Sequence, residues 1–116
     1  MQWFYISALM MTLTAIIHSV AGERRLVGPA LAGQQGIFAN AQSRKVLRGA
    51  WHLTSAYMVL TAAVMIWPDT DHWLKALVAS VWLVIGLVSL LSTRGKHVGW
   101  PTLTLAGFTG WAGTLG

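Results

Sequence analysis

The sequence predicts an all-α integral membrane protein, with four transmembrane helices in an antiparallel bundle and both termini on the non-cytoplasmic side. Three observations predict it. Hydrophobic residues make up 55% of the 116 residues and charged residues only 9%, against about a quarter charged in soluble domains. The apolar residues gather in long runs, and the basic residues fall almost entirely in the connections on one side. The chain has room for a single membrane domain.

The predicted spans cover residues 3–21, 48–67, 74–92 and 100–116. A helix crosses the hydrocarbon in roughly 20 residues, so the first three runs are long enough. The fourth crosses fully only if its helix starts near Val98 or the bilayer thins locally, and partial insertion is the alternative. Ser19-Val20-Ala21 could suit a signal peptidase, but no basic residue precedes the first run, which favours a retained helix.

The charge pattern predicts the orientation. Seven of the eight Lys and Arg residues lie in or beside segments 22–49 and 93–99, and only Lys75 lies in the connection between the second and third spans. The positive-inside rule therefore makes the connection 22–47 cytoplasmic, in a bacterial-type inner membrane. The net charge of +5 is read as a topology signal and not as a nucleic-acid surface. The absence of cysteine excludes thiolate metal ligands.

The connection 22–47 is too long for a minimal turn. Gly28-Pro29 is expected to end any helical extension of the first span, because proline disfavours helix at the preceding residue. Helix is expected to resume from about Asn40 and to continue into the second span. Trp51 and Trp100, at the cytoplasmic span ends, are interpreted as anchors at the membrane interface.

Three of the four histidines are predicted to lie at similar depth near the cytoplasmic leaflet: His18, His52 and His97. His72 falls in the outer connection. On the first span, one helical stripe carries Ser7, Met11, Thr14 and His18. On the second, one face carries Arg48, His52 and Ser55. Lipid cannot satisfy polar groups, so we expect both stripes to face the bundle interior and His18 to point toward His52.

A histidine cluster at this depth could serve a redox or proton-handling subunit in three ways. A metal could be held by His18, His52 and Glu23, provided the helix ends at Gly22 and turns the carboxylate back. Haem could take axial histidines, including His97, and a set of arginines near its propionates is available: Arg24, Arg25 and Arg48. Proton relay or quinone contact is the third way. The structural alternative is that each histidine simply bonds a nearby backbone or serine.

The runner-up from another class is a non-catalytic accessory subunit of a larger membrane complex. The fourth span presents small residues at close-approach spacing, among them Ala106, Gly110 and Gly113. Such a face could bind a membrane partner or a second copy, although internal packing would use it equally well. The fingerprints of soluble hydrolases and nucleotide enzymes are absent. A channel or exporter is weakened by the lack of a carboxylate in mid-membrane.

Overall fold

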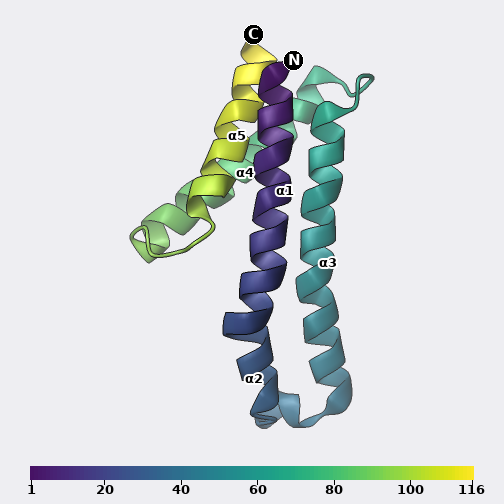
Figure 1. Cartoon of the computed structure of the whole chain (residues 1–116), viewed down its shortest axis with the longest axis vertical. Helices are drawn as coiled ribbons and strands as arrows, with labels where there is room; N and C mark the ends of the chain where they lie inside the picture. The colour runs from purple at the N-terminus through teal and green to yellow at the C-terminus, as the bar shows by residue number, and fades with distance from the viewer.

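The computed structural model describes residues 1–116 and is all-helical, without strands. Four long helices carry the fold, and short helical segments link the first two of them (Figure 1). In chain order the elements are α1 (Gln2–Gly22), a π-helical turn (Glu23–Val27), α2 (Gly28–Ala32), a 3-10 turn (Gly36–Ala39), α3 (Ala41–Ile66), α4 (His72–Thr93) and α5 (Trp100–Leu115).

The long helices alternate in direction, so the N- and C-termini meet at the same end of the molecule (Figure 1). α5 packs against both α1 and α4, whereas α3 packs almost entirely against α1. The α4–α5 hairpin leans away from the α1–α3 pair toward the other end (Figure 1). The half of the molecule far from the termini is therefore a two-helix contact, and it contains the polar residues discussed below.

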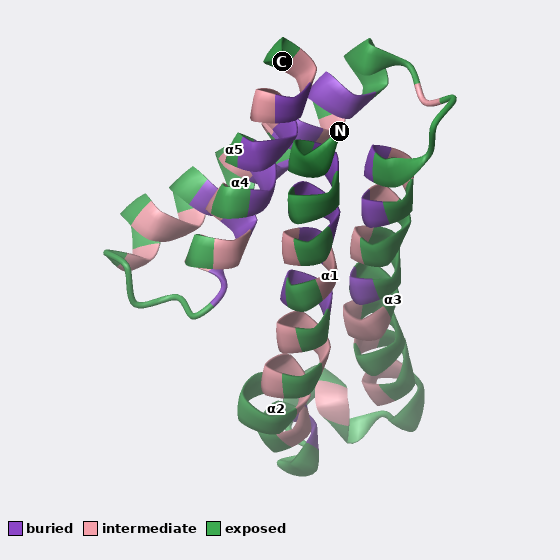
Figure 2. Cartoon of the chain, turned by 45° about the horizontal axis from the view of Figure 1, so that its top comes forward, coloured by how far each residue is buried: buried purple, intermediate pink, exposed green.

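The apolar core lies in the half near the termini, where buried residues gather (Figure 2). Nine buried residues form it: Phe4, Ala8, Met11, Ala62, Met65, Ala79, Trp82, Leu103 and Ala106. Glycines on α5 let backbones approach closely, since a Cβ at Gly110 would lie 2.8 Å from Ala79 Cβ and one at Gly113 would meet the Phe4 ring. The Ser7 hydroxyl donates to the Ala106 carbonyl at 2.7 Å within this core. Close backbone contact and interhelical hydrogen bonds are what hold helices together in lipid.

Three helices are long and apolar enough to cross a membrane: Gln2–Ala32, Ala41–Ile66 and His72–Thr93. α5 has 16 residues, which is about 24 Å at 1.5 Å per residue. It is thus shorter than the roughly 30 Å hydrocarbon core of a bilayer. Large apolar side chains such as Leu9, Tyr57 and Val84 are exposed on the outer surface, as expected of a protein whose solvent is lipid.

The helix that begins as α1 does not end at Gly28-Pro29, contrary to the prediction. It continues through a π-helical turn at Glu23–Val27 into α2, with Pro29 in the first turn of α2. Proline lacks an N–H, and its ring clashes with the carbonyl four residues earlier in a regular α-helix. The wider i→i+5 turn places that carbonyl differently, so the chain passes the proline without leaving the helix.

The chain reverses after Ala32 and re-enters helix at Ala41. The Asn40 side chain accepts from the backbone N–H groups of Gln42 and Ser43, which caps α3 at its N-terminus. Arg44 donates to the carbonyls of Phe38 and Ala39, at 2.7 and 2.9 Å. These bonds hold the reversal against the start of α3, which fixes how α3 is aligned along α1.

Candidate functional site

A continuous polar network joins α1 to α3 in the two-helix half of the molecule. α1 and its extension contribute Ser19 and Glu23, which are four residues apart and so lie on the same helix face. α3 contributes the predicted stripe Arg48, His52 and Ser55. The physical reason for this meeting is the one expected from sequence: polar side chains on apolar helices are satisfied by facing each other.

One end of the network is a carboxylate held by two bases. Arg48 donates to Glu23 Oε1, with Nε 2.9 Å and Nη2 2.8 Å away, and His52 Nε2 lies 3.1 Å from Glu23 Oε2. Glu23 lies beyond the apolar run 3–21. The hydrogen bond from Arg48 lowers the pKa of the Glu23 carboxyl from its ordinary value, partial desolvation opposes it, and the His52 bond adds to the lowering. The carboxyl is therefore ionised at neutral pH.

Two serine hydroxyls connect His52 to His18. His52 Nδ1 is 3.0 Å from Ser19 Oγ, Ser19 Oγ is 2.7 Å from Ser55 Oγ, and Ser55 Oγ is 2.8 Å from His18 Nδ1. The histidines themselves make no direct contact. His18 Nε2 has no hydrogen-bond partner, so it is the open end of the chain of bonds.

Trp51 is part of the α1–α3 contact. Its indole lies flat on the His18 imidazole, with ring centroids 4.3 Å apart and planes 8° apart. Its Nε1–H donates to the His18 carbonyl at 2.8 Å. The prediction placed Trp51 at the headgroups because it stands at a span end. The absence of a side chain on Gly22, opposite Trp51, is what admits the indole between the helices.

Glu23 reaches the site by a different route from the one predicted. The helix does not end at Gly22; the backbone stays helical there. Glu23 follows His18 by five residues, so its carboxylate faces away from that histidine. It follows Ser19 by four residues and therefore lies on the same helix face as Ser19, where both contact His52. Ser19 is therefore the residue that sequence reasoning missed. The signal was present in the i, i+4 spacing of Ser19 and Glu23.

The remaining predicted site residues lie outside the network. His97 sits in the α4–α5 loop, where its Nδ1 accepts from the Gly99 N–H at 3.2 Å. Arg24 and Arg25 are exposed and make no hydrogen bond or ion pair. No group of three or more histidine, cysteine or acidic side chains is placed to hold a metal ion. Among the three predicted metal ligands, His52 and Glu23 are bonded to each other. His18 is joined to His52 only through the hydroxyls of Ser55 and Ser19.

The small-residue face of α5 is used inside the chain. Ala106, Gly110 and Gly113 are buried against α1 and α4. A partner could reach these residues only by displacing α1. The predicted binding of a membrane partner or a second copy through Ala106, Gly110 and Gly113 therefore stays a prediction, and the burial of these residues does not support it.

The fold and the site together define a small helical protein with three helices apolar enough to span a membrane and a polar network between the first two. No protein-family model, curated protein or solved structure matches this chain.

Proposed function

We propose that this chain is a small polytopic protein of a bacterial-type inner membrane that handles protons at the cytoplasmic leaflet. The single observation that carries the proposal is the unbroken series of hydrogen bonds from Glu23 through His52, Ser19 and Ser55 to His18. Every group between the two ends can both donate and accept a proton. The proposed topology has four spans, with both termini outside.

Charge placement supports this topology. The basic residues of the 22–49 and 93–99 segments lie at helix ends and loops far from the termini, where the positive-inside rule puts the cytoplasm. Lys75, the single lysine or arginine near the other end, is buried, with its Nζ 4.5 Å from the Phe4 ring centre. The N- and C-termini lie at the same end of the molecule (Figure 1), which agrees with both termini on the same side of the membrane. Because α5 is short, its full crossing requires local thinning of the bilayer.

Helix length supports a position for the network at the boundary between water and lipid. Trp3 and Glu23 are about 20 residues apart, roughly 30 Å along a helix, which matches the thickness of the hydrocarbon. If Trp3 marks the outer interface, Glu23 lies at the cytoplasmic one and His18 lies roughly 7 Å deeper. The network then leads from the headgroup region into the apolar layer, which is the path a relay needs.

The chemistry of the relay follows from the number of protons each group carries. When His52 is protonated on both nitrogens, Nε2–H donates to the ionised Glu23 and Nδ1–H donates to Ser19. Ser19 then donates to Ser55, and Ser55 donates to His18 Nδ1. Three short hops move one proton from His52 Nδ1 to His18 Nδ1. His18, now a cation, can release its other proton from Nε2. Before a second proton can pass, both serine hydroxyls must rotate back to their starting directions, and the His18 proton must return from Nδ1 to Nε2.

Residues at the two ends support their parts in this scheme. Glu23, held by Arg48, lies within hydrogen-bond distance of His52 Nε2 and orients that ring. At the other end, Trp51 fixes the ring of His18 by stacking and by its bond to the His18 carbonyl. The free Nε2–H is where a quinone carbonyl could accept a hydrogen bond. Metal and haem forms of the proposal have less support, because three of the four ring nitrogens of His18 and His52 are already hydrogen-bonded.

Nitrogen NMR of histidine-labelled protein in lipid bicelles tests the relay directly. We expect the His18 tautomer to change in step with protonation of His52 as pH is varied. Ser55→Ala should abolish that coupling and leave both histidines in place. Ser92→Ala is the matched control, since the Ser92 hydroxyl donates only to the Val88 carbonyl of its own helix. Independent behaviour of the two histidines in the wild-type protein would overturn the proposal.

The alternative function is a non-catalytic accessory subunit, in which the network only clamps α1 to α3. This alternative predicts that Ser55→Ala lowers thermal stability while the wild-type histidines show no coupling. It also predicts co-purification with a membrane partner in fixed stoichiometry. The cofactor forms are tested by elemental analysis and an absorbance spectrum of the purified protein. A metal or Soret band that is lost on replacing His18 and His52 by alanine would support them over the relay alone.

A further inference from the structure

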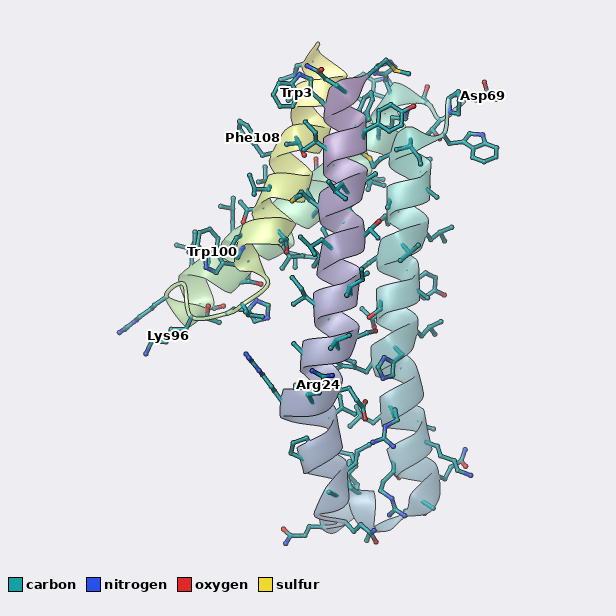
Figure 3. All side chains as sticks on the ribbon, in the orientation of Figure 1. Trp3, Arg24, Asp69, Lys96, Trp100 and Phe108 are labelled. Atoms are coloured by element: carbon teal, nitrogen blue, oxygen red, sulfur yellow. The ribbon has the colours of Figure 1, made fainter.

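An open groove lies between α1 and the α4–α5 loop, on a different face of α1 from the polar network. Its volume is about 370 Å³, and it is lined by Ile16, Ile17, Val20, Ala21, Arg24, Arg25 and Val98. The groove exists because the α4–α5 hairpin leans away from α1 (Figure 1). Figure 3 shows Arg24 in the π-helical turn that follows α1, and Lys96 at the outer tip of the hairpin loop. The lining is thus an apolar strip that ends in two arginines.

The two arginines differ from the other two arginines of the 22–49 segment. Arg48 is bound to Glu23, and Arg44 is bound to the carbonyls of Phe38 and Ala39. Arg24 and Arg25 are exposed and make no hydrogen bond or ion pair, and Glu23, the acidic group nearest in sequence, is already taken. Two adjacent guanidinium groups at the end of an apolar groove therefore offer an uncompensated positive charge.

We propose that this groove binds one anionic phospholipid of the cytoplasmic leaflet. Arg24 and Arg25 would bind the phosphate, and the strip from Ile16 to Ala21 with Val98 would contact an acyl chain. Arginine is suited to phosphate because its planar fork can donate two hydrogen bonds at once. From Ile16 to Arg24 the helix rises roughly 12 Å, close to the half-thickness of the hydrocarbon, about 15 Å. The apolar strip and the charges thus match the layout of one lipid in one leaflet.

This inference shares the membrane orientation of the proposed function but none of the relay residues. Basic juxtamembrane segments attract negative lipids in general, whatever the shape of the surface. A site made of both a groove and two arginines should go beyond that general attraction. It should require a long acyl chain as well as a negative headgroup.

Thermal unfolding of the purified protein in mild detergent, with added lipid, tests the site. We expect long-chain phosphatidylglycerol to raise the unfolding temperature, whereas phosphatidylcholine and inorganic phosphate do not. Arg24→Gln with Arg25→Gln should remove most of the phosphatidylglycerol effect. Lys45→Gln with Lys96→Gln removes the same charge from exposed positions that do not line the groove, and it should leave most of the effect intact.

A second variant separates the groove from the charges. Val20→Trp places an indole in the groove at an exposed position, and it should weaken the response to long-chain lipid while both arginines remain. Equal responses to phosphatidylglycerol and phosphatidylcholine would overturn the proposal, as would equal loss in the two charge variants. A response to inorganic phosphate as large as that to the lipid would also overturn it, because the site would then bind anions without needing an acyl chain. Ser55→Ala should retain the lipid response, so failure of the relay and failure of the lipid site are distinguishable.

Discussion

Gly22 and Trp51 face each other so closely that a single methyl group would not fit between them. A Cβ built on Gly22 would lie 2.6 Å from Trp51 Cε2, well inside van der Waals contact. The indole uses this space to stack on His18 and to donate to the His18 carbonyl. The lack of a side chain at one position on α1 thus sets the spacing of α1 and α3 beside the polar network.

Gly22→Ala should therefore destabilise the protein, by about 1–3 kcal/mol, the usual cost of overpacking. The reason is that Trp51 must leave its stacked position or the helices must separate. Gly49→Ala on α3 is the matched control, because nothing lies within 4 Å of a Cβ at that position. Alanine there should be neutral or stabilising by up to about 1 kcal/mol, through helix propensity. Thermal unfolding in detergent would check both, and equal stability of the two variants would contradict the role given to Gly22.

Acid should remove the contribution of Glu23 to stability. The pKa of the folded Glu23 carboxyl is lowered, mainly by Arg48. Its stabilising effect is thus fully present above the ordinary carboxyl pKa and is lost as pH falls through the lowered value. Glu23→Gln should unfold at a lower temperature than wild type near neutral pH, and the difference should shrink in strong acid. Asp69→Asn, in an exposed turn without an ion pair, is the control. A difference that does not change with pH would count against the Glu23–Arg48 pair.

Gly107→Ala should disrupt the α4–α5 hairpin. A Cβ on Gly107 would lie 2.6 Å from the Leu83 Cα, and backbone atoms cannot move aside as a flexible side chain can. We expect a loss of at least about 1–3 kcal/mol. The comparison is Gly33→Ala, where the nearest atom to a new Cβ is 3.8 Å away. Unfolding temperatures within error of each other would show that the two helices are further apart than described.

Ser7→Ala should cost only a little stability. The Ser7 hydroxyl is fully buried and donates to the Ala106 carbonyl. Interhelical hydrogen bonds in membrane proteins contribute about 0.6 kcal/mol on average. Thr109 also donates to that carbonyl, at 3.3 Å, so the acceptor keeps a partner. We expect a loss below about 1 kcal/mol; a loss several times larger would mean that Ser7 positions α5 more strongly than one bond can.

The helical class of the fold could be predicted from the sequence because it depends on the solvent. Long uncharged runs can satisfy their backbone in lipid only as helices, so α1, α3 and α4 follow directly. The packing order could not be predicted, because lipid-facing and helix-facing residues are equally apolar. That α5 lies between α1 and α4 depends on Gly107 and Gly110 meeting Leu83 and Ala79, a match that no single segment reveals.

The candidate site was predicted in part, and there is a physical reason why some of its residues could be predicted and others could not. Helical spacing alone put Arg48, His52 and Ser55 on one face, since those positions repeat with the helix turn. The packing of Trp51 on His18 was not predicted, because a tryptophan at a span end suits the membrane interface as well as an interhelical gap. Pro29 was misread because nothing in the sequence distinguishes a helix that stops at a proline from one that widens by a turn to pass it.

The π-helical turn before Pro29 keeps the chain helical beyond α1, so the extension has a fixed length. Had the helix stopped at Gly28-Pro29, Arg24 and Arg25 would lie in its final turns, where helices fray. Since the backbone stays helical from Gln2 to Ala32, the two cations are fixed at a set distance from the core near the termini. In the proposed membrane orientation this distance is set by the helix, so a bilayer of a different thickness would have to deform or tilt the helix.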